Sequence, residues 1–221
     1  MEASHPVPAD PVFNQSPAEE RANALSHAVG GLLALVALPV VAEGLDTAHH
    51  PLRQAALAVF FTTMALMYAV SAAYHWVPIG PAKRLLRRLD HAVIFVFIAG
   101  SFTPYALLAI HRGDGPTPLL AVWAVALTGM ALKLCNRLSR TLPSTLLYLA
   151  FGWLVVLVAY PVVVALPPTG LRFLVAGGLS YTLGCLFFLL DERLRFSHLV
   201  WHLFVITGSL CHVMAVQHAL P

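Results

Sequence analysis

The stretch that decides the fold is residues 197–220, SHLVWHLFVITGSLCHVMAVQHAL. It contains no Asp, Glu, Lys or Arg. A helix of about 20 apolar residues is long enough to cross a hydrocarbon layer of roughly 30 Å. His198 and His202 stand near one end of the stretch. It therefore predicts a membrane-spanning helix with ionisable side chains at one end.

Six further apolar stretches precede this one, separated by short polar segments. The seven predicted spans are 22–42, 54–76, 89–110, 118–134, 145–166, 171–190 and 197–220. The whole sequence is 59% hydrophobic and 10% charged, whereas about a quarter of the residues in a soluble domain are charged. Backbone amides in lipid need partners within their own segment, which favours helices. The sequence predicts an all-α membrane protein, a seven-transmembrane helix bundle.

The domain organisation follows from the same pattern. Residues 1–21 hold four prolines among polar residues, a composition typical of a disordered tail. Residues 22–221 are then one transmembrane domain.

The orientation is predicted from the basic residues, because Lys and Arg resist translocation across the membrane. Ten of the 13 lie in the N-terminal tail and the even-numbered loops. These are Arg21, Lys83, Arg84, Arg87, Arg88, Lys133, Arg137, Arg140, Arg193 and Arg195. The opposite side holds Arg53, Arg112 and Arg172. The N-terminus is therefore expected in the cytoplasm and the C-terminus outside.

Charge and cysteine content exclude other classes. The net charge of +3 is explained by topology and by attraction to anionic headgroups, so no nucleic-acid partner is expected. Cys135, Cys185 and Cys211 stand far apart and are expected to be packing residues, neither paired nor metal-ligating.

Ionisable residues at membrane depth cost free energy unless they are paired, hydrated or bound to metal, so each is a candidate functional residue. In the predicted topology eight polar residues fall at one level, the cytoplasmic end. They are Glu20, Asn23, His27, His75, Asp90, His91, His198 and His202. We expect the functional site at this end.

Three of these histidines have the spacing of a metal site. His198 and His202 are four residues apart, about 6 Å along a helix, and share one face. His75 comes from the second span at the same depth. Three imidazoles with an open fourth position are typical of catalytic zinc, and thiolate ligands or an oxygen cage for calcium or magnesium are not suggested. The predicted cofactor is Zn²⁺, held by His75, His198 and His202.

Two further residues are candidates for catalysis. Asp90 is expected to face the same cavity and to hold or deprotonate a water on the metal. Ser71 lies one turn before His75, where its hydroxyl is able to bond a water or a developing oxyanion.

Each assignment has a simpler alternative. The three histidines are also compatible with a hydrogen-bond network that holds no metal. Asp90 is able to cap its helix and pair with Arg87 or Arg88. Ser71 is able to bond to a carbonyl of its own helix.

The other polar residues of the spans receive no catalytic role. His212 lies ten residues, about 15 Å, beyond His202, so it is not expected to share the ion and is predicted to bond to another helix. His91 is interpreted as structural. The roles of Glu20, Asn23 and His27 stay open.

Four segments in combination resemble the haemolysin III proteins of the progestin and adipoQ receptor family. They are Glu20–His27 (ERANALSH), Ser71–His75 (SAAYH), Leu89–His91 (LDH) with Ala99–Tyr105 (AGSFTPY), and His198–His202 (HLVWH) with the later His212. The resemblance runs from about Glu19 to the end of the sequence. It implies seven helices, a cytoplasmic N-terminus, a zinc ion near the inner face, and a multi-pass location in the cell membrane, of the bacterial inner-membrane type.

The resemblance also bears on function. It matches His75, His198 and His202 to the zinc ligands, Asp90 to the acidic residue near the metal, and Ser71 to the serine beside it. Because the wider superfamily includes alkaline ceramidases, it implies a hydrolase of lipid amide bonds, with membrane lipid as substrate or ligand. The alternatives are a receptor-like sensor for membrane homeostasis with a structural zinc and, less favoured, a pore-forming haemolysin. The oligomeric state is not determined by the sequence.

Overall fold

A computed structural model describes residues 15–45, 50–111, 113, 115–158, 160–163 and 166–219. Throughout these residues the regular secondary structure is helical. The helices are α1 (Pro17–Gly44), α2 (Pro51–Trp76), α3 (Pro81–His111), α4 (Thr117–Leu134), α5 (Thr141–Val158), α6 (Tyr160–Val163), α7 (Pro168–Leu189) and α8 (Ser197–Ala219). Seven are long, and α5 and the four-residue α6 both fall in the region of the fifth predicted span.

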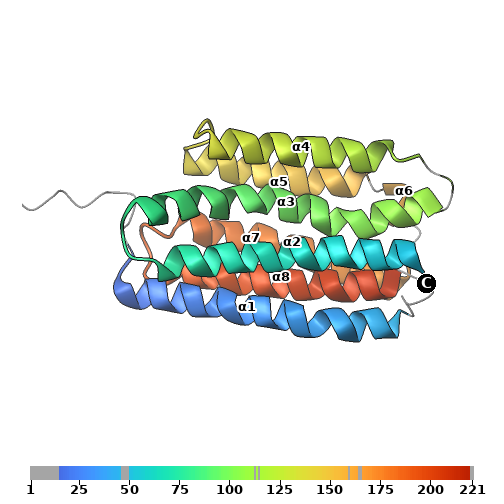
Figure 1. The fold of residues 1–221 in the computed structure, drawn as a ribbon, viewed down its shortest axis with the longest axis horizontal. Coiled ribbons are helices and arrows are strands. Elements are labelled where there is room, and N and C mark those ends of the chain that lie inside the picture. The colour runs from blue at the N-terminus through green and yellow to red at the C-terminus, as the bar shows by residue number, and fades with distance from the viewer. Residues whose placement is uncertain are drawn as a thin grey trace, which may run out of the picture.

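The long helices form one bundle in which they run side by side, alternating in direction (Figure 1). α2 packs between α1 and α3, and α8 packs between α1 and α7. α4 covers α3, whereas α5 has only sparse contacts with α3 and α7. The bundle thus has a dense part, built from α1, α2, α3, α7 and α8, and a looser flank at α5.

Close contacts in the dense part depend on small residues. A Cβ atom on Gly184 of α7 would lie 2.7 Å from the Cβ of Phe204 on α8. A Cβ atom on Gly208 of α8 would lie 2.6 Å from the ring of Tyr181 on α7. Such contacts between small and large residues are the usual means of packing helices in lipid, where burial of apolar surface gives no driving force.

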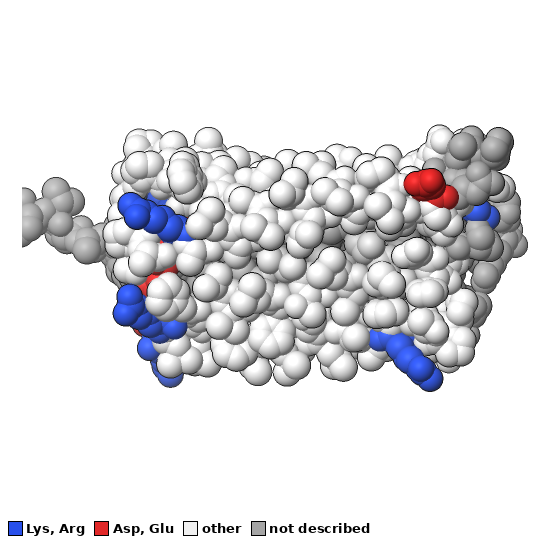
Figure 2. All heavy atoms as spheres, turned by 90° about the horizontal axis from the view of Figure 1, so that it is seen from below, with Lys and Arg blue, Asp and Glu red and all other residues white. Residues whose placement is uncertain are grey.

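The outer surface confirms a multi-pass membrane protein. Six of the long helices, α1, α2, α4, α5, α7 and α8, have the length and apolar composition of a membrane span. On the face shown in Figure 2, a broad middle band carries no charged side chain, while Lys and Arg gather at both ends and more densely at the end where α1 begins. The predicted all-α membrane bundle is therefore confirmed, and the predicted direction of insertion stays a prediction.

The start of α1 corrects the predicted tail. Residues 17–21, assigned to the tail, are helical, because Ser16 caps the helix and Pro17 occupies its first position. The Ser16 Oγ atom accepts a hydrogen bond from the Glu19 backbone N–H, and the Glu19 carboxylate accepts one from the Ser16 N–H. This reciprocal pair is a capping box. Residues 1–14 of the predicted tail lie outside the described residues.

Candidate metal centre

Polar side chains from four helices meet at one end of the bundle. α2 ends there, and α1, α3 and α8 begin there, as the element labels in Figure 1 show. Because neighbouring helices run in opposite directions, the last turn of α2 lies level with the first turns of the other three. This places His75 of α2 beside His198 and His202 of α8.

The three histidines form a compact cluster. One ring nitrogen of each lies within 4.8 Å of the corresponding nitrogens of the other two. The ring centroids are 5.0 Å apart for His75 and His198, 5.1 Å for His75 and His202, and 4.7 Å for His198 and His202. All three side chains are buried, with His202 only 1% exposed. This group could hold a metal ion.

Each ring is oriented by an oxygen atom at Nδ1. His75 Nδ1 lies 2.8 Å from the Glu20 carboxylate, and His198 Nδ1 lies 3.1 Å from the Asp191 carboxylate.

His202 Nδ1 lies 3.2 Å from the backbone carbonyl of Asn23 and 2.9 Å from the Ser26 hydroxyl. The Ser26 hydroxyl itself donates to that same carbonyl. All three rings therefore have a hydrogen-bond acceptor at Nδ1.

These acceptors assign the proton of each neutral ring. A carboxylate or carbonyl only accepts, so Nδ1 is the atom that carries the hydrogen and donates it. Nε2 is then the atom with a free lone pair. Ligand histidines in metalloproteins are oriented in this way, with Nδ1–H bonded to a carboxylate or a backbone carbonyl.

The residues present fit a bound cation. His75 Nε2 is buried and has no hydrogen-bond partner among the described residues, and an unsatisfied buried nitrogen is costly unless a ligand is bound to it. Because the three nitrogens all lie within 4.8 Å of one another, a central point lies at most about 2.8 Å from each. The rings would move inward by less than about 1 Å to reach a zinc–nitrogen distance of about 2.0–2.1 Å.

Asp90 and Ser71 lie next to this cluster but outside it. The Asp90 carboxylate on α3 has Ser71 of α2 and His198 of α8 among its neighbours, and the charges of Arg87 and Lys133 also act on it. Ser71 is buried. The alternative pairing of Asp90 with Arg87 or Arg88 is not a close ion pair: within the described part of the chain, the ion pairs within 4.0 Å join Glu20 to His75 and Lys83, and Asp191 to His198.

Comparison with known proteins matches residues 15–213 to the family model described as Haemolysin-III related. This chain belongs to the haemolysin III family. It is 35% identical to Hemolysin-3 of Bacillus cereus over 193 residues, which cover 86% of this chain and 87% of the relative. It is 34% identical to the Hemolysin-3 homolog of Bacillus subtilis over 194 residues, 86% and 89% of the two chains. The resemblance inferred from the sequence is confirmed.

A human protein is also similar to this haemolysin III family member. The monocyte to macrophage differentiation factor of Homo sapiens is 28% identical over 224 residues, which cover 96% of this chain and 89% of that protein. The similarity therefore extends over nearly the full length of the helical domain.

The structure gives Glu20 a role that the sequence left open. One carboxylate oxygen bonds to His75, and the other lies 2.9 Å from the Lys83 ammonium group of α3. Lys83 also donates to the carbonyl oxygens of Tyr74 and Val77, at 2.9 and 3.3 Å. These carbonyls at the end of α2 lack partners within the helix, so Lys83 both satisfies them and fixes Glu20.

Asn23 and His27 hold the other side of the cluster. Besides the carbonyl of Asn23, α1 presents the His27 ring, which stacks on His202 with centroids 3.4 Å apart and an interplanar angle of 11°. The His27 ring also packs against Tyr68 of α2 in a T-shaped arrangement, with centroids 5.1 Å apart. Glu20, Asn23 and His27 thus form one face of α1 against the cluster, as their spacing of three and four residues allows.

His91 belongs to a separate network, as the sequence interpretation of a structural residue implied. Its Nδ1 lies 3.4 Å from the Lys133 ammonium group of α4, and its backbone carbonyl accepts a bond from the Tyr148 hydroxyl of α5. Lys133 donates in addition to Ser144 of α5. This network joins α3, α4 and α5 beside the metal centre.

Sequence reasoning placed Glu20 and Asn23 at this end of the bundle without assigning their roles as outer partners, and it gave no such role to Lys83 or Asp191. A signal for two of them was present, because a ligand histidine needs an acceptor at Nδ1 and both carboxylates fall at the same end of the bundle. The carbonyl of Asn23 and the ammonium of Lys83 left no comparable signal.

Proposed function

We propose that this protein is a zinc-dependent hydrolase that cleaves an amide or ester bond of a membrane lipid. The observation that supports the proposal most directly is the three-histidine cluster, with every Nδ1 engaged by an oxygen and Asp90 and Ser71 adjacent. Asp90 and Ser71 matter because a purely structural metal site needs neither a carboxylate nor a hydroxyl beside it.

His75, His198 and His202 would hold the ion through Nε2. Three nitrogen ligands leave a coordination position free, as in catalytic zinc sites, whereas structural zinc sites use four protein ligands. Zinc bound there supplies Lewis-acid polarisation of an acyl carbonyl.

The remaining steps fall to residues of the chain. Asp90 would accept a proton from the attacking water and return it to the departing amine or alcohol. Ser71 would donate a hydrogen bond to the oxygen that gains negative charge at the acyl carbon. His27 and Glu20 keep the rings of His202 and His75 in position for both steps.

The surroundings of the site favour a lipid substrate. The cluster lies where the apolar spans begin and end, at the more basic end of the bundle, which we assign to the cytoplasmic side. A lipid approaching sideways would bring its headgroup region to this level while its chains stay in the hydrocarbon layer.

A receptor-like sensor with a structural zinc is the alternative. It is favoured by the way the cluster fastens five segments, because α1, α2, α3, α8 and the connection that holds Asp191 all contribute a bond. A change in the packing of these helices would then report on the surrounding membrane.

One experiment separates the two. Zinc-loaded wild-type protein and the variants His202→Ala and Asp90→Asn are incubated with a ceramide and with a diacyl ester lipid, and released fatty acid is measured by mass spectrometry. A hydrolase releases fatty acid in a reaction that both variants lose, although Asp90→Asn keeps its zinc.

The contrary outcome is equally clear. If the wild type holds one zinc per chain and releases no fatty acid from either lipid class, the hydrolase is excluded and the sensor is favoured.

A further inference from the structure

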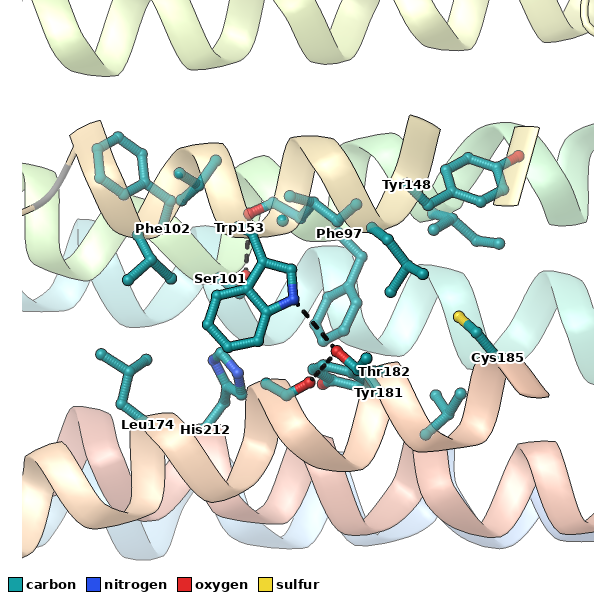
Figure 3. A pocket seen from close by; sticks show the side chains of 18 of the residues that line it. Phe97, Ser101, Phe102, Tyr148, Trp153, Leu174, Tyr181, Thr182, Cys185 and His212 are labelled. Carbon is teal, nitrogen blue, oxygen red and sulfur yellow. Dashed lines mark hydrogen bonds between the residues drawn. The ribbon is translucent and has the colours of Figure 1, made fainter. Parts of the chain in front are cut away.

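A second candidate site lies in the middle of the bundle. A partly open cavity of about 170 Å³ is lined mainly by α3, α5, α7 and α8, and it extends from Trp201, next to His202, to His212. Figure 3 shows its walls, with Trp153 of α5 above and His212, Tyr181 and Thr182 below. No Lys, Arg, Asp or Glu lines the cavity, and most of its wall is aliphatic or aromatic.

Two polar side chains in this wall have no partner. Both ring nitrogens of His212 and the hydroxyl oxygen of Tyr105 are buried, and none has a hydrogen-bond partner among the described residues. Tyr105 is only 4% exposed. The sequence predicted that His212 bonds to another helix, and this is corrected: its ring packs on α7 without a hydrogen bond.

Most other polar groups of the wall are engaged within the protein. Trp153 Nε1 donates to the Thr182 hydroxyl at 3.2 Å, and Thr182 donates to the carbonyl of Gly178. The Tyr181 hydroxyl lies 3.1 Å from Ser209, and Ser101 donates to a carbonyl of its own helix. Among the fully buried polar atoms of the wall, those without a partner in the described residues belong to His212 and Tyr105.

His212 is held in place by packing rather than by bonds. A Cβ atom on Gly177 of α7 would lie 2.5 Å from His212 Cδ2, so the imidazole occupies the space that the glycine leaves. The ring also packs against Tyr181, with centroids 5.4 Å apart. The protein thus keeps an unbonded imidazole in a fixed position at a depth where its desolvation is costly.

The depth and the composition of the cavity define its occupant. His212 lies about 15 Å along α8 from His202, roughly half the thickness of the hydrocarbon layer. A charged ligand would find no counter-charge among the lining residues. A buried water needs two to four polar partners, and this wall offers few. An apolar molecule with a hydrogen-bonding group satisfies both the wall and the two free side chains.

We propose that this cavity binds an uncharged apolar alcohol, whose hydroxyl bonds to His212 or Tyr105. A hydroxyl both donates and accepts, as do a neutral imidazole and a tyrosine hydroxyl, so it complements either. The size suits a body of about six carbons, because an engineered apolar cavity of about 150 Å³ binds benzene. α5, with its sparse contacts, forms the wall through which such a molecule enters from the lipid.

The test uses heavy-atom quenching of tryptophan fluorescence. Trp153 and Trp201 line the cavity, and the other two tryptophans, Trp76 and Trp123, are replaced by Phe in the parent protein. The full chain in nanodiscs is titrated with 6-bromohexan-1-ol and with 1-bromohexane. The measured quantity is the ratio of the two affinities, and comparing this ratio between variants cancels the different partitioning of the probes into lipid.

The expected result is saturable quenching by the alcohol and a ratio that falls about fivefold in His212→Leu or Tyr105→Phe, the value of one hydrogen bond. His212→Gln, which can still donate and accept, retains most of the ratio and shows that loss of bonding, and not of folding, is responsible. Quenching that does not saturate, or a ratio equal in all the proteins, overturns the proposal.

Two lipid compositions distinguish the sources of the alcohol. If ricinoleoyl phosphatidylcholine, whose chains carry a hydroxyl, weakens binding of the bromoalcohol relative to dioleoyl phosphatidylcholine, the site takes a hydroxylated lipid chain. Equal binding in the two lipids assigns the site to a small free alcohol. The titration needs no bound metal, so its outcome is independent of the hydrolase test.

Discussion

Two histidines on the same helix, His202 and His212, are placed in opposite ways. The first has its Nδ1 bonded to α1 and its ring stacked on His27. The second has no hydrogen bond at either ring nitrogen within the described residues. The comparison teaches that burial alone does not mark a candidate metal ligand. An acceptor at the second ring nitrogen is the stronger sign, because in metalloproteins such an acceptor orients the ring and directs its other lone pair to the metal.

The largest expected effect breaks the metal centre itself. We expect His75→Ala to lower bound zinc from about one ion per chain to nearly none, because two nitrogen ligands from one helix hold the ion far more weakly than three. Metal content of the purified protein, by mass spectrometry, checks this.

The matched control is His91→Ala, at the same end of the bundle but bonded to Lys133. It should retain its zinc. Equal metal content in the two variants would show that the cluster is a hydrogen-bond network without an ion.

A smaller effect is expected from the outer partner. Glu20→Gln removes the carboxylate that His75 Nδ1 faces at 2.8 Å, and we expect zinc affinity to fall about 10- to 100-fold while the stoichiometry at saturation is kept. Competition with a fluorescent chelator measures the change. Glu43→Gln, at the opposite, exposed end of α1, is the control and should leave the affinity unchanged.

The packing of His212 in the cavity wall is tested by substituting Gly177, the α7 residue that its ring contacts. In Gly177→Ala the new methyl group would lie 2.5 Å from His212 Cδ2, so we expect a loss of about 1–3 kcal/mol in stability from overpacking. Thermal unfolding in detergent measures it. The neighbouring Gly178→Ala, whose Cβ would meet Trp153 at an ordinary 3.6 Å, should be tolerated, and a similar loss in both would contradict the proposed packing.

The smallest effect is expected at His212. Because its ring nitrogens have no partners, His212→Leu removes polar groups that gain nothing from burial, and the stability should change by less than about 1 kcal/mol or rise. His202→Leu, by contrast, leaves the Asn23 carbonyl with one partner fewer and should destabilise the protein. A large loss of stability in His212→Leu would mean that its ring makes a bond in the folded protein.

Much of the architecture follows from the sequence. Each long apolar run of the sequence predicts one helix. Because the end of α2 and the start of α8 lie at the same end of the bundle, His75 comes close to His198 and His202. What depth along the bundle does not fix is the rotation of each helix about its axis. The position of Asp90 in the sequence did not give its neighbours, because the rotation of α3 brings it near Ser71 and His198 as well as Arg87.

Two lysines illustrate the same limit of sequence reasoning. Lys83 and Lys133 were counted with the loop charges that set the topology, yet they are only 2% and 5% exposed. One pairs with Glu20, and the other bonds to Ser144 and His91. The cavity was equally out of reach, because it arises from the sparse packing of α5, which composition does not reveal.

Glu19, in the first turn of α1, has a consequence for biogenesis. Its carboxylate receives the backbone N–H of Phe196 at 2.8 Å, just before α8, across 177 residues of chain. The first helix to leave the ribosome therefore gains this hydrogen bond to Glu19 only after the segment before the last helix has been made. His198 and His202 also come from α8, so a cation at the three-histidine cluster would require the last helix to be in place.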